Sequence, residues 1–235
     1  MSRFNVVIAT PSTGECKFPY ALALARMVAY FSQVRVFPEV AEQALDIIGV
    51  EGSGVSAGRE DLVRIALGKE NMTHLLFIDQ DMSFGVDCLH SLARRRQSIV
   101  GCNYRMRVPP ADFTAIRIDK GGRMQTTKDS TGLEEAFYMG FGFCLLSREA
   151  LLAVSEPRFM IEYQPESGGY TTEDNPFFVK ARAAGHRCYV DQDASRGIWH
   201  VGTMNYRYDR DYSSLAEPQA TATATVKPIR SVANG

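Results

Sequence analysis

The stretch Thr73-His74-Leu75-Leu76-Phe77-Ile78-Asp79-Gln80-Asp81 decides the fold of this 235-residue chain. Residues 74–78 form a continuous apolar run of strand length, which is typical of a strand buried on both faces of a parallel sheet. The run ends at two carboxylates separated by one glutamine. Carboxylates at this spacing can share one hard divalent cation, with phosphate oxygens completing its coordination. The stretch therefore predicts a buried strand that leads into a metal site.

Strand and helix patterns alternate on both sides of this stretch. Upstream we expect a strand at 5–9, a helix at 18–31, a short strand at 34–37, and a helix at 57–67 with Ser56 as N-cap and Gly68 just past its end. Downstream we expect a helix at 86–96 and a strand at 98–101. This is the pattern of βαβ units, and it predicts an α/β fold with a mainly parallel sheet flanked by helices. Such a sheet binds ligands at the carboxyl ends of its strands, where residues 10–12 and 79–81 fall.

The second half of the chain predicts a smaller antiparallel portion. We expect a hairpin of 114–118 and 123–127, an apolar stretch at 136–146, helices at 147–154 and 173–184, a polar loop at 162–172 and a strand at 186–190. After about residue 215 the composition shifts to Ala, Thr, Pro and Ser. We therefore expect one domain over 1–215 and a disordered tail over 216–235.

The bulk composition favours a soluble cytoplasmic protein. The net charge of −1 provides no global field that would attract nucleic acid or an anionic membrane. The N-terminus shows no signal peptide, and no apolar run reaches the ~18 residues that a membrane span needs. The five cysteines are widely spaced, with no CxxC pair, which indicates buried free thiols in a reducing compartment. The oligomeric state stays open.

Asp-x-Asp occurs three times, at 79–81, 191–193 and 209–211. The pattern alone is weak evidence for a metal, because a helix N-cap followed by a turn gives the same letters. Only the first copy follows a continuous apolar strand that itself belongs to a strand–helix–strand series. We therefore assign the metal to Asp79 and Asp81 and interpret the other two copies as structural.

Three further motifs each allow a structural and a functional interpretation. Thr171 and Asp174 fit a capping box, yet Glu173 and Asp174 are also a pair of acids at a helix start. His200 can be a structural histidine or a metal ligand, and Gly202 would let the backbone approach a phosphate. The glycines of Gly140-Phe141-Gly142-Phe143 indicate either a bulged strand or a floor against which a sugar ring lies.

Taken in order and spacing, these motifs resemble the GT-A glycosyltransferases, most of all the compact single-domain members of bacteriophage and bacterial genomes. The resemblance covers about residues 4–205. Its motifs are Thr10-Pro11, Ser56-Ala57-Gly58-Arg59-Glu60-Asp61-Leu62-Val63, residues 73–81, Val100-Gly101-Cys102-Asn103-Tyr104-Arg105, Gly140-Phe141-Gly142-Phe143, Thr172-Glu173-Asp174, Ala184-Gly185 and His200-Val201-Gly202. Similar sequences often carry Asn where this chain has Asp61, so the role of that position stays open.

The resemblance implies a single-domain GT-A fold, a nucleoside-diphosphate sugar as donor, with UDP favoured, and a Mn²⁺ or Mg²⁺ ion. It implies metal binding by Asp79, Asp81 and His200. It implies a nucleotide-sugar pocket formed by Thr10, Pro11, Arg59, Asp79, Gly140, Phe141 and Gly142. The expected contacts with the acceptor are Tyr104, Arg105 and Trp199.

Glycosyl transfer passes through an oxocarbenium-like state, and the acceptor hydroxyl must lose a proton. The resemblance implies that Asp174 is the general base of an inverting reaction, with Glu173 contacting donor or acceptor. In a retaining reaction no such base is needed, and Asp174 would be a capping or sugar-binding residue.

The acceptor and two other classes of function stay open. A glycan, a protein side chain, a lipid-linked sugar and a hydroxymethylated base of phage DNA are candidate acceptors. The DNA option rests on the phage-like resemblance and on the loop with Arg105 and Arg107. A nucleotidyltransferase of similar fold would usually carry a glycine-rich basic loop after the first strand, and residues 10–17 match that poorly. A non-catalytic nucleotide-sugar-binding protein would tolerate loss of Asp174 or His200, and both are present.

Overall fold

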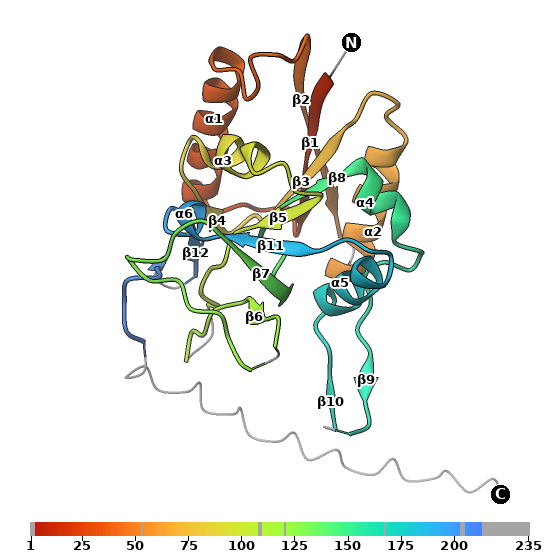
Figure 1. Ribbon diagram of the computed structural model, residues 1–235, viewed down its shortest axis with the longest axis vertical. Helices are drawn as coiled ribbons and strands as arrows, with labels where there is room; N and C mark the ends of the chain where they lie inside the picture. The colour runs from red at the N-terminus through yellow and green to blue at the C-terminus, as the bar shows by residue number, and fades with distance from the viewer. Residues whose placement is uncertain are drawn as a thin grey trace, which may run out of the picture.

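The computed structural model describes residues 3–52, 54–107, 110–119, 121–166, 168–202 and 205–212. Its centre is an eight-stranded sheet with strand order β2-β1-β3-β8-β5-β11-β7-β6 (Figure 1). The strands of this sheet are β1 (Arg3–Ser12), β2 (Glu42–Glu51), β3 (His74–Ile78), β5 (Ile99–Gly101), β6 (Ile116–Arg117), β7 (Leu133–Tyr138), β8 (Phe143–Ser147) and β11 (Cys188–Asp191). The helices are α1 (Phe18–Gln33), α2 (Val55–Leu67), α3 (Cys88–Arg94), α4 (Arg148–Ala153), α5 (Asp174–Ala183) and α6 (Gln192–Ser195).

The pairing confirms a mainly parallel sheet with a smaller antiparallel portion. Strand β1 is parallel to both β2 and β3, and β5 is parallel to β11. Strand β8 lies between β3 and β5 and is antiparallel to both, and β7 is antiparallel to β11 and β6. Two short sheets complete the fold, one of β4 (Met82–Ser83), β12 (Trp199–Val201) and β13 (Asn205–Tyr206), the other of β9 (Tyr163–Gln164) and β10 (Gly169–Tyr170).

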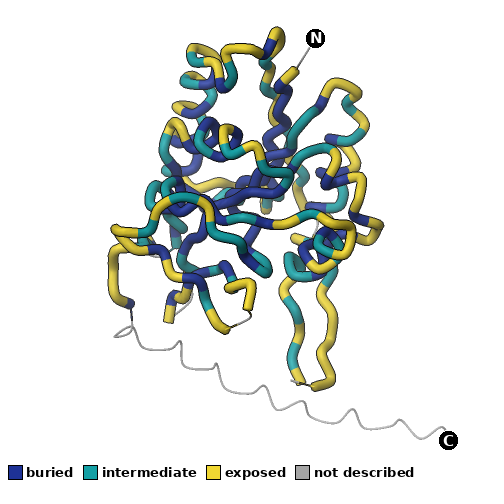
Figure 2. Tube along the Cα trace, in the orientation of Figure 1, coloured by how far each residue is buried: buried dark blue, intermediate teal, exposed yellow. Residues whose placement is uncertain are grey.

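Alternation along the central strands builds a core on each face of the sheet. Side chains point to opposite faces in turn, so Leu75 and Phe77 join one cluster while Leu76 and Ile78 join the other. Helices α2, α4 and α5 contribute to the first cluster, and α1 and α3 to the second. The buried residues follow the central strands (Figure 2). Strand β3 is covered on both faces, which explains why its sequence is a continuous apolar run.

The strand expected at 34–37 is wrong, and the second strand is β2 instead. Helix α1 ends at Gln33, and the backbone of the following segment bonds to the side chain of Gln43. Strand β2 pairs with β1 over its whole length at the edge of the sheet, and half or more of its residues are exposed. Its sequence therefore lacks the apolar continuity that marks the central strands.

Two further local expectations need correction. Helix α2 begins at Val55 with Gly54 as N-cap, so Ser56 lies inside the helix, although Gly68 does end it. The hairpin of 114–118 and 123–127 forms only in part. Ile116 bridges Arg123, but the ladder of β6 continues to β7 and not to residues 123–127.

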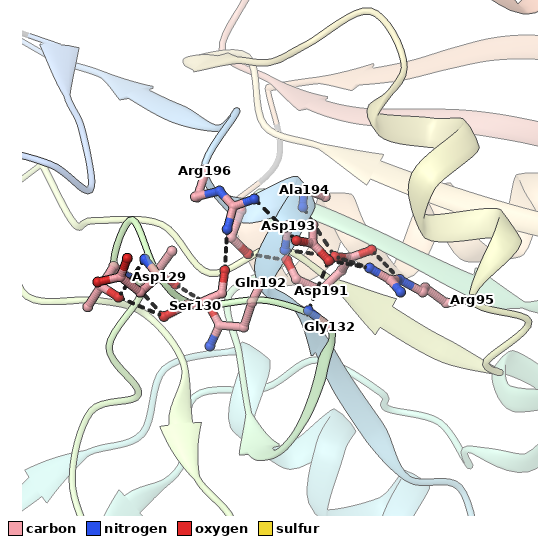
Figure 3. A network of polar contacts seen from close by, with 12 residues as sticks. Arg95, Asp129, Ser130, Gly132, Asp191, Gln192, Asp193, Ala194 and Arg196 are labelled. Carbon is pink, nitrogen blue, oxygen red and sulfur yellow. Dashed lines mark hydrogen bonds and ion pairs between the residues drawn. The ribbon is translucent and has the colours of Figure 1, made fainter.

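The second Asp-x-Asp, at 191–193, is structural as expected (Figure 3). Asp191 caps α6 by accepting from the backbone N–H groups of Asp193 and Ala194. Asp191 Oδ2 lies 2.8 Å from Arg95 Nε, and Asp193 Oδ2 lies 2.7 Å from Arg95 Nη2. Arg95 therefore already supplies a cation to both carboxylates. In the third copy, Asp209 lies 3.3 Å from Arg207 Nε.

The cysteines described here are all free, but their burial differs from the expectation at one position. Cys88, Cys102, Cys144 and Cys188 are buried, whereas Cys16 is exposed because it lies in the loop after β1. No helix among the described residues is long and apolar enough to cross a membrane. The expected tail, 216–235, lies outside the described residues.

Candidate active site

A cleft of about 250 Å³ lies at the carboxyl ends of β1 and β3, where an open α/β sheet is expected to bind ligands. It is lined by Pro11, Ser12, Thr13, Val55, Arg59, Asp79, Gln80, Asp81, Arg107, Glu173 and His200. A second hollow of about 270 Å³ shares Thr13, Gln80, Asp81 and Arg107 with it. The two hollows therefore adjoin at the first Asp-x-Asp.

Gln80, the middle residue of that motif, holds one wall of the cleft in place. Its side-chain oxygen accepts from Ser12 Oγ and from the backbone N–H of Thr13, both at 3.1 Å. Its side-chain nitrogen donates to Thr13 Oγ1 at 2.7 Å, and its backbone oxygen accepts from the N–H of Lys17. The loop after β1 is thus fixed to the loop after β3.

Arg59, on α2, is a buried cation surrounded by three carboxylates. Its Nη2 atom lies 3.0 Å from Asp79 Oδ1, and its Nε atom lies 3.8 Å from both Glu173 Oε1 and Asp174 Oδ1. Burial opposes the charge, but the three carboxylates outweigh that effect and raise the pKa of Arg59. The guanidinium also packs over the rings of Phe77 and Phe141. It joins the end of β3 to the start of α5.

The capping box expected for Thr171 and Asp174 does not form. Helix α5 begins at Asp174, its N-cap residue Glu173 makes no side-chain cap, and Thr171 Oγ1 accepts from the backbone of Glu162. The Asp174 side chain is 15% exposed. Its burial raises the pKa of the carboxyl to about 8, against the opposing effect of Arg59 and with smaller contributions from Glu173 and Asp79. A carboxyl with such a pKa beside a cleft fits general acid–base chemistry.

Asp81 and His200 form the second half of the cleft. Strand β12 pairs with β4, and the N–H of Val201 donates to Asp81 O at 2.7 Å, which brings His200 beside the motif. His200 Nε2 lies 3.3 Å from Asp81 Oδ2, and Arg107 forms an ion pair with the same oxygen. Burial alone would raise the pKa of Asp81, but His200 and Arg107 together lower it.

The donor set of Asp81 and His200 fits a divalent metal ion. His200 Nδ1 lies 3.0 Å from the carbonyl oxygen of Arg105, which can only accept, so Nδ1 carries the proton. A proton on Nε2 would be donated to Asp81, which is the arrangement that lowers the pKa of Asp81. Without that proton, the Nε2 lone pair and the carboxylate face one another, and both can be ligands of one cation. Arg107 supplies a positive charge at this place here.

Asp79, by contrast, is turned to Arg59, and its contacts do not support the expected role of metal ligand. Among the described residues, no group of three or more His, Cys, Asp or Glu side chains is arranged to hold a metal without other ligands. A metal held by Asp81 and His200 would therefore need oxygen atoms from a ligand or water.

The predicted nucleotide-sugar residues divide into lining and supporting ones. Pro11, Arg59 and Asp79 line the cleft, whereas Thr10 is buried one residue earlier and hydrogen-bonds Tyr20 at 2.7 Å. Gly140, Phe141 and Gly142 are also buried and do not line it. The N–H of Gly142 donates to the Tyr104 hydroxyl, and its carbonyl accepts from the N–H of Asp79. A Cβ at either glycine would collide with the Tyr104 hydroxyl. Residues 140–142 therefore have a supporting role: they hold the backbone of Asp79 and do not line the cleft.

The expected acceptor contacts lie elsewhere than in the open cleft. Tyr104 is buried beneath Gly140 and Gly142, so an acceptor has no access to it. Arg105 donates to Ala111 O and packs over Phe113, which makes it a structural residue of its loop. Trp199 packs under Arg207. Arg107, two residues after Arg105, is the basic residue that reaches the cleft, and no local sequence pattern distinguishes it from Arg105.

Comparison of this chain with known proteins shows similarity in the fold. No family model matches the chain, and no curated protein matches it. Among solved structures the chain is similar to A197 from STIV, with 17% identity, 85% of this chain and 86% of that chain covered, and a TM-score of 0.56. It is also similar to GalNAc-T7 in complex with UDP, GalNAc and Mn²⁺, with 10% identity, 87% of this chain covered and a TM-score of 0.53. It has the GT-A fold. The chain spans 44% of the GalNAc-T7 chain.

Proposed function

We propose that this protein is a metal-dependent glycosyltransferase that moves a sugar from a nucleoside-diphosphate sugar, with UDP favoured, to an acceptor hydroxyl. The observation that carries the proposal is the pair of polar centres at one cleft, which Glu173 lines and Asp174 adjoins without lining it. Asp79, Glu173 and Asp174 surround Arg59, and beside them Asp81 faces His200. The similarity to GalNAc-T7, whose structure contains UDP, GalNAc and Mn²⁺, supports the same assignment.

The donor would occupy the cleft with its nucleoside against Pro11, Ser12 and Thr13. Asp79, held by Arg59, would accept hydrogen bonds from the ribose hydroxyls. A divalent metal, Mn²⁺ or Mg²⁺, held by Asp81 and His200, would offset the negative charge that develops on the diphosphate leaving group. Arg107 adds a second positive charge at the same end of the cleft.

Asp174 is the proposed general base of an inverting reaction. The acceptor oxygen attacks the anomeric carbon as the bond to the diphosphate breaks, and the hydroxyl proton passes to the Asp174 carboxylate. Arg59 favours the ionised form of Asp174 that this step requires, and burial opposes it. Glu173 lines the cleft next to the proposed base and would contact the sugar.

Donor hydrolysis tests the proposal without knowledge of the acceptor. The protein is incubated with a panel of nucleoside-diphosphate sugars and Mn²⁺ or Mg²⁺, and release of nucleoside diphosphate is measured. We expect metal-dependent release from at least one donor, abolished in Asp81→Asn. No release from any donor with either metal, together with no metal-dependent donor binding by calorimetry, would contradict the proposed function.

A further inference from the structure

The hairpin of β9 and β10 extends from the start of α5, away from the central sheet (Figure 1). Within the part of the chain that the structure describes, its two strands pair with each other alone, with Tyr163 opposite Tyr170. The N–H of Thr171 donates to Glu162 O, and the N–H of Glu162 donates to Thr171 Oγ1, which closes the base of the hairpin. We call residues 161–166 and 168–171 the arm.

The arm exposes aromatic surface. The rings of Tyr163 and Tyr170 are 5.3 Å apart, yet these residues remain 56% and 73% exposed, and Ile161 beside them is 58% exposed. A cross-strand contact explains why the rings meet. It does not explain why the hairpin presents this apolar surface to solvent, because none of the three belongs to a core cluster. Grouped exposed apolar side chains of this kind mark binding surfaces.

The arm leads directly into the proposed catalytic acids. Tyr170 precedes Asp174 by four residues, so the two can be separated by at most ~14 Å. Thr171 and Thr172 connect the base of the hairpin to Glu173, which lines the cleft. A molecule that contacts both the arm and Asp174 therefore needs to span only a short distance.

The charge of the arm excludes a polyanion. Between Phe159 and Val179 the sequence contains no Lys or Arg, but it contains Glu162 and Glu166 in addition to Glu173 and Asp174. Binding of single-stranded nucleic acid combines aromatic stacking with a positively charged groove, and here the charge has the wrong sign. An uncharged ligand meets no such repulsion.

We infer that the arm binds the acceptor and that the acceptor is a neutral glycan, an inference that rests on the proposed function of the cleft. Tyrosine combines an apolar ring with a hydroxyl group, which matches a sugar ring that has apolar C–H faces and hydroxyl edges. The carboxylates of Glu162 and Glu166 can accept hydrogen bonds from sugar hydroxyls. The arm then holds one part of the glycan while the hydroxyl to be modified reaches Asp174.

The test uses the full chain on an array of neutral oligosaccharides, with single-stranded DNA and unstructured peptides as additional probes. We expect binding to neutral oligosaccharides. For the best of these, calorimetry should show a dissociation constant raised about tenfold or more in Tyr163→Ala/Tyr170→Ala, and nearly unchanged in Tyr163→Phe/Tyr170→Phe, which keeps the rings. The affinity should not fall with salt, in contrast to binding of nucleic acid.

Leu152→Ala is the matched control, because Leu152 is an exposed apolar residue of α4 outside the arm. Thermal melting checks that the variants fold. An array without glycan binding, preferential binding of DNA or peptide, or a change of oligomeric state as the sole effect of the tyrosine variants would overturn the inference. Donor hydrolysis by the unaltered protein is measured separately. A result that contradicts glycan binding by the arm can therefore be told apart from one that contradicts the proposed function of the cleft.

Discussion

Arg59 Nε lies 3.8 Å from Asp174 Oδ1, and through this contact one buried guanidinium connects the proposed base to the first acid of the Asp-x-Asp motif. Among the described residues, Nε and Nη1 of Arg59 have no hydrogen-bond partner, and neither does Asp174 Oδ1. Unpaired buried polar groups are costly, so their presence at one place indicates a site arranged for a ligand and not for stability alone.

Replacing Arg59 tests this arrangement. Arg59→Met should lower the free energy of unfolding by about 3–5 kcal/mol, because it leaves three partly buried carboxylates without their cation. The measurement is urea unfolding at pH 7. Arg64→Met on the same helix is the control, since the pair of Arg64 with Asp61 is exposed and should contribute no more than about 1 kcal/mol. Equal effects of the two changes would contradict the role of Arg59.

Asp174→Asn tests the general base. The variant should fold and bind donor normally, and transfer to an acceptor should fall ~10²–10⁴-fold, because the amide cannot take the proton. In the unaltered protein the rate should rise with pH through the raised pKa of Asp174, near 8, and this dependence should be absent from the variant. Near-normal transfer by the variant, or retention of anomeric configuration in the product, would reject Asp174 as base.

The raised pKa of Asp174 also predicts how stability depends on pH. The folded protein holds this proton more tightly than the unfolded chain does, so the stabilisation is complete below pH ~4 and is lost as pH rises to about 8. Melting temperatures at pH 5 and pH 9 should therefore differ more for the unaltered protein than for Asp174→Asn. An identical difference in both proteins would show that Asp174 ionises normally.

Asp81→Asn tests the metal site. It removes an oxygen ligand and a negative charge, and we expect turnover to be lost while the protein stays folded. Binding of Mn²⁺, followed by electron paramagnetic resonance, should weaken at least tenfold. Asp193→Asn is the matched control, because Asp193 is held by Arg95 and Arg196 and should leave most activity. Full metal-dependent activity of Asp81→Asn would rule out this site.

Replacing Arg107 should change the affinity for the metal ion and the affinity for the donor in opposite directions. Its ion pair with Asp81 competes with a metal ion, so Arg107→Gln should tighten binding of Mn²⁺ to the free protein. The side chain is 53% exposed, which limits the gain to about two- to fivefold. The same change should weaken binding of the donor, because it removes a positive charge near the diphosphate. Calorimetry with each ligand in turn checks both signs, and weaker Mn²⁺ binding would disprove the competition.

The first Asp-x-Asp and its strand could be predicted from the sequence because local pattern determines both. A covered central strand must be apolar throughout, and the residues that follow it must lie at the ligand-binding edge. Strand β2 escaped prediction because an edge strand is half exposed and shows no such run. The sequence left the capping and catalytic interpretations of residues 171–174 open, because the same letters suit a helix start and a pair of catalytic acids, and the structure shows that the capping box does not form.

The roles around Arg59 and Arg107 could not be predicted from local pattern. Both depend on pairings between residues far apart in the chain, Arg59 with Asp174 and Arg107 with Asp81. The burial of Tyr104 could not be predicted either, because nothing in the local sequence distinguishes it from an exposed tyrosine. Its position under Gly140 and Gly142 follows only from the tertiary packing.

The reversed direction of β8 has a consequence for the order in which the chain assembles. Strand β8 is the neighbour that joins β3 to β5, although it follows both in sequence. During synthesis from the N-terminus, β1, β2 and β3 can pair as soon as they emerge, but β5 has no place in the sheet until residues 143–147 arrive. The nascent protein must therefore hold an open apolar edge on β3 while about seventy further residues are added, at ~5–20 residues per second. In that interval the half-built sheet is exposed to chaperones and to aggregation, well before the cleft exists.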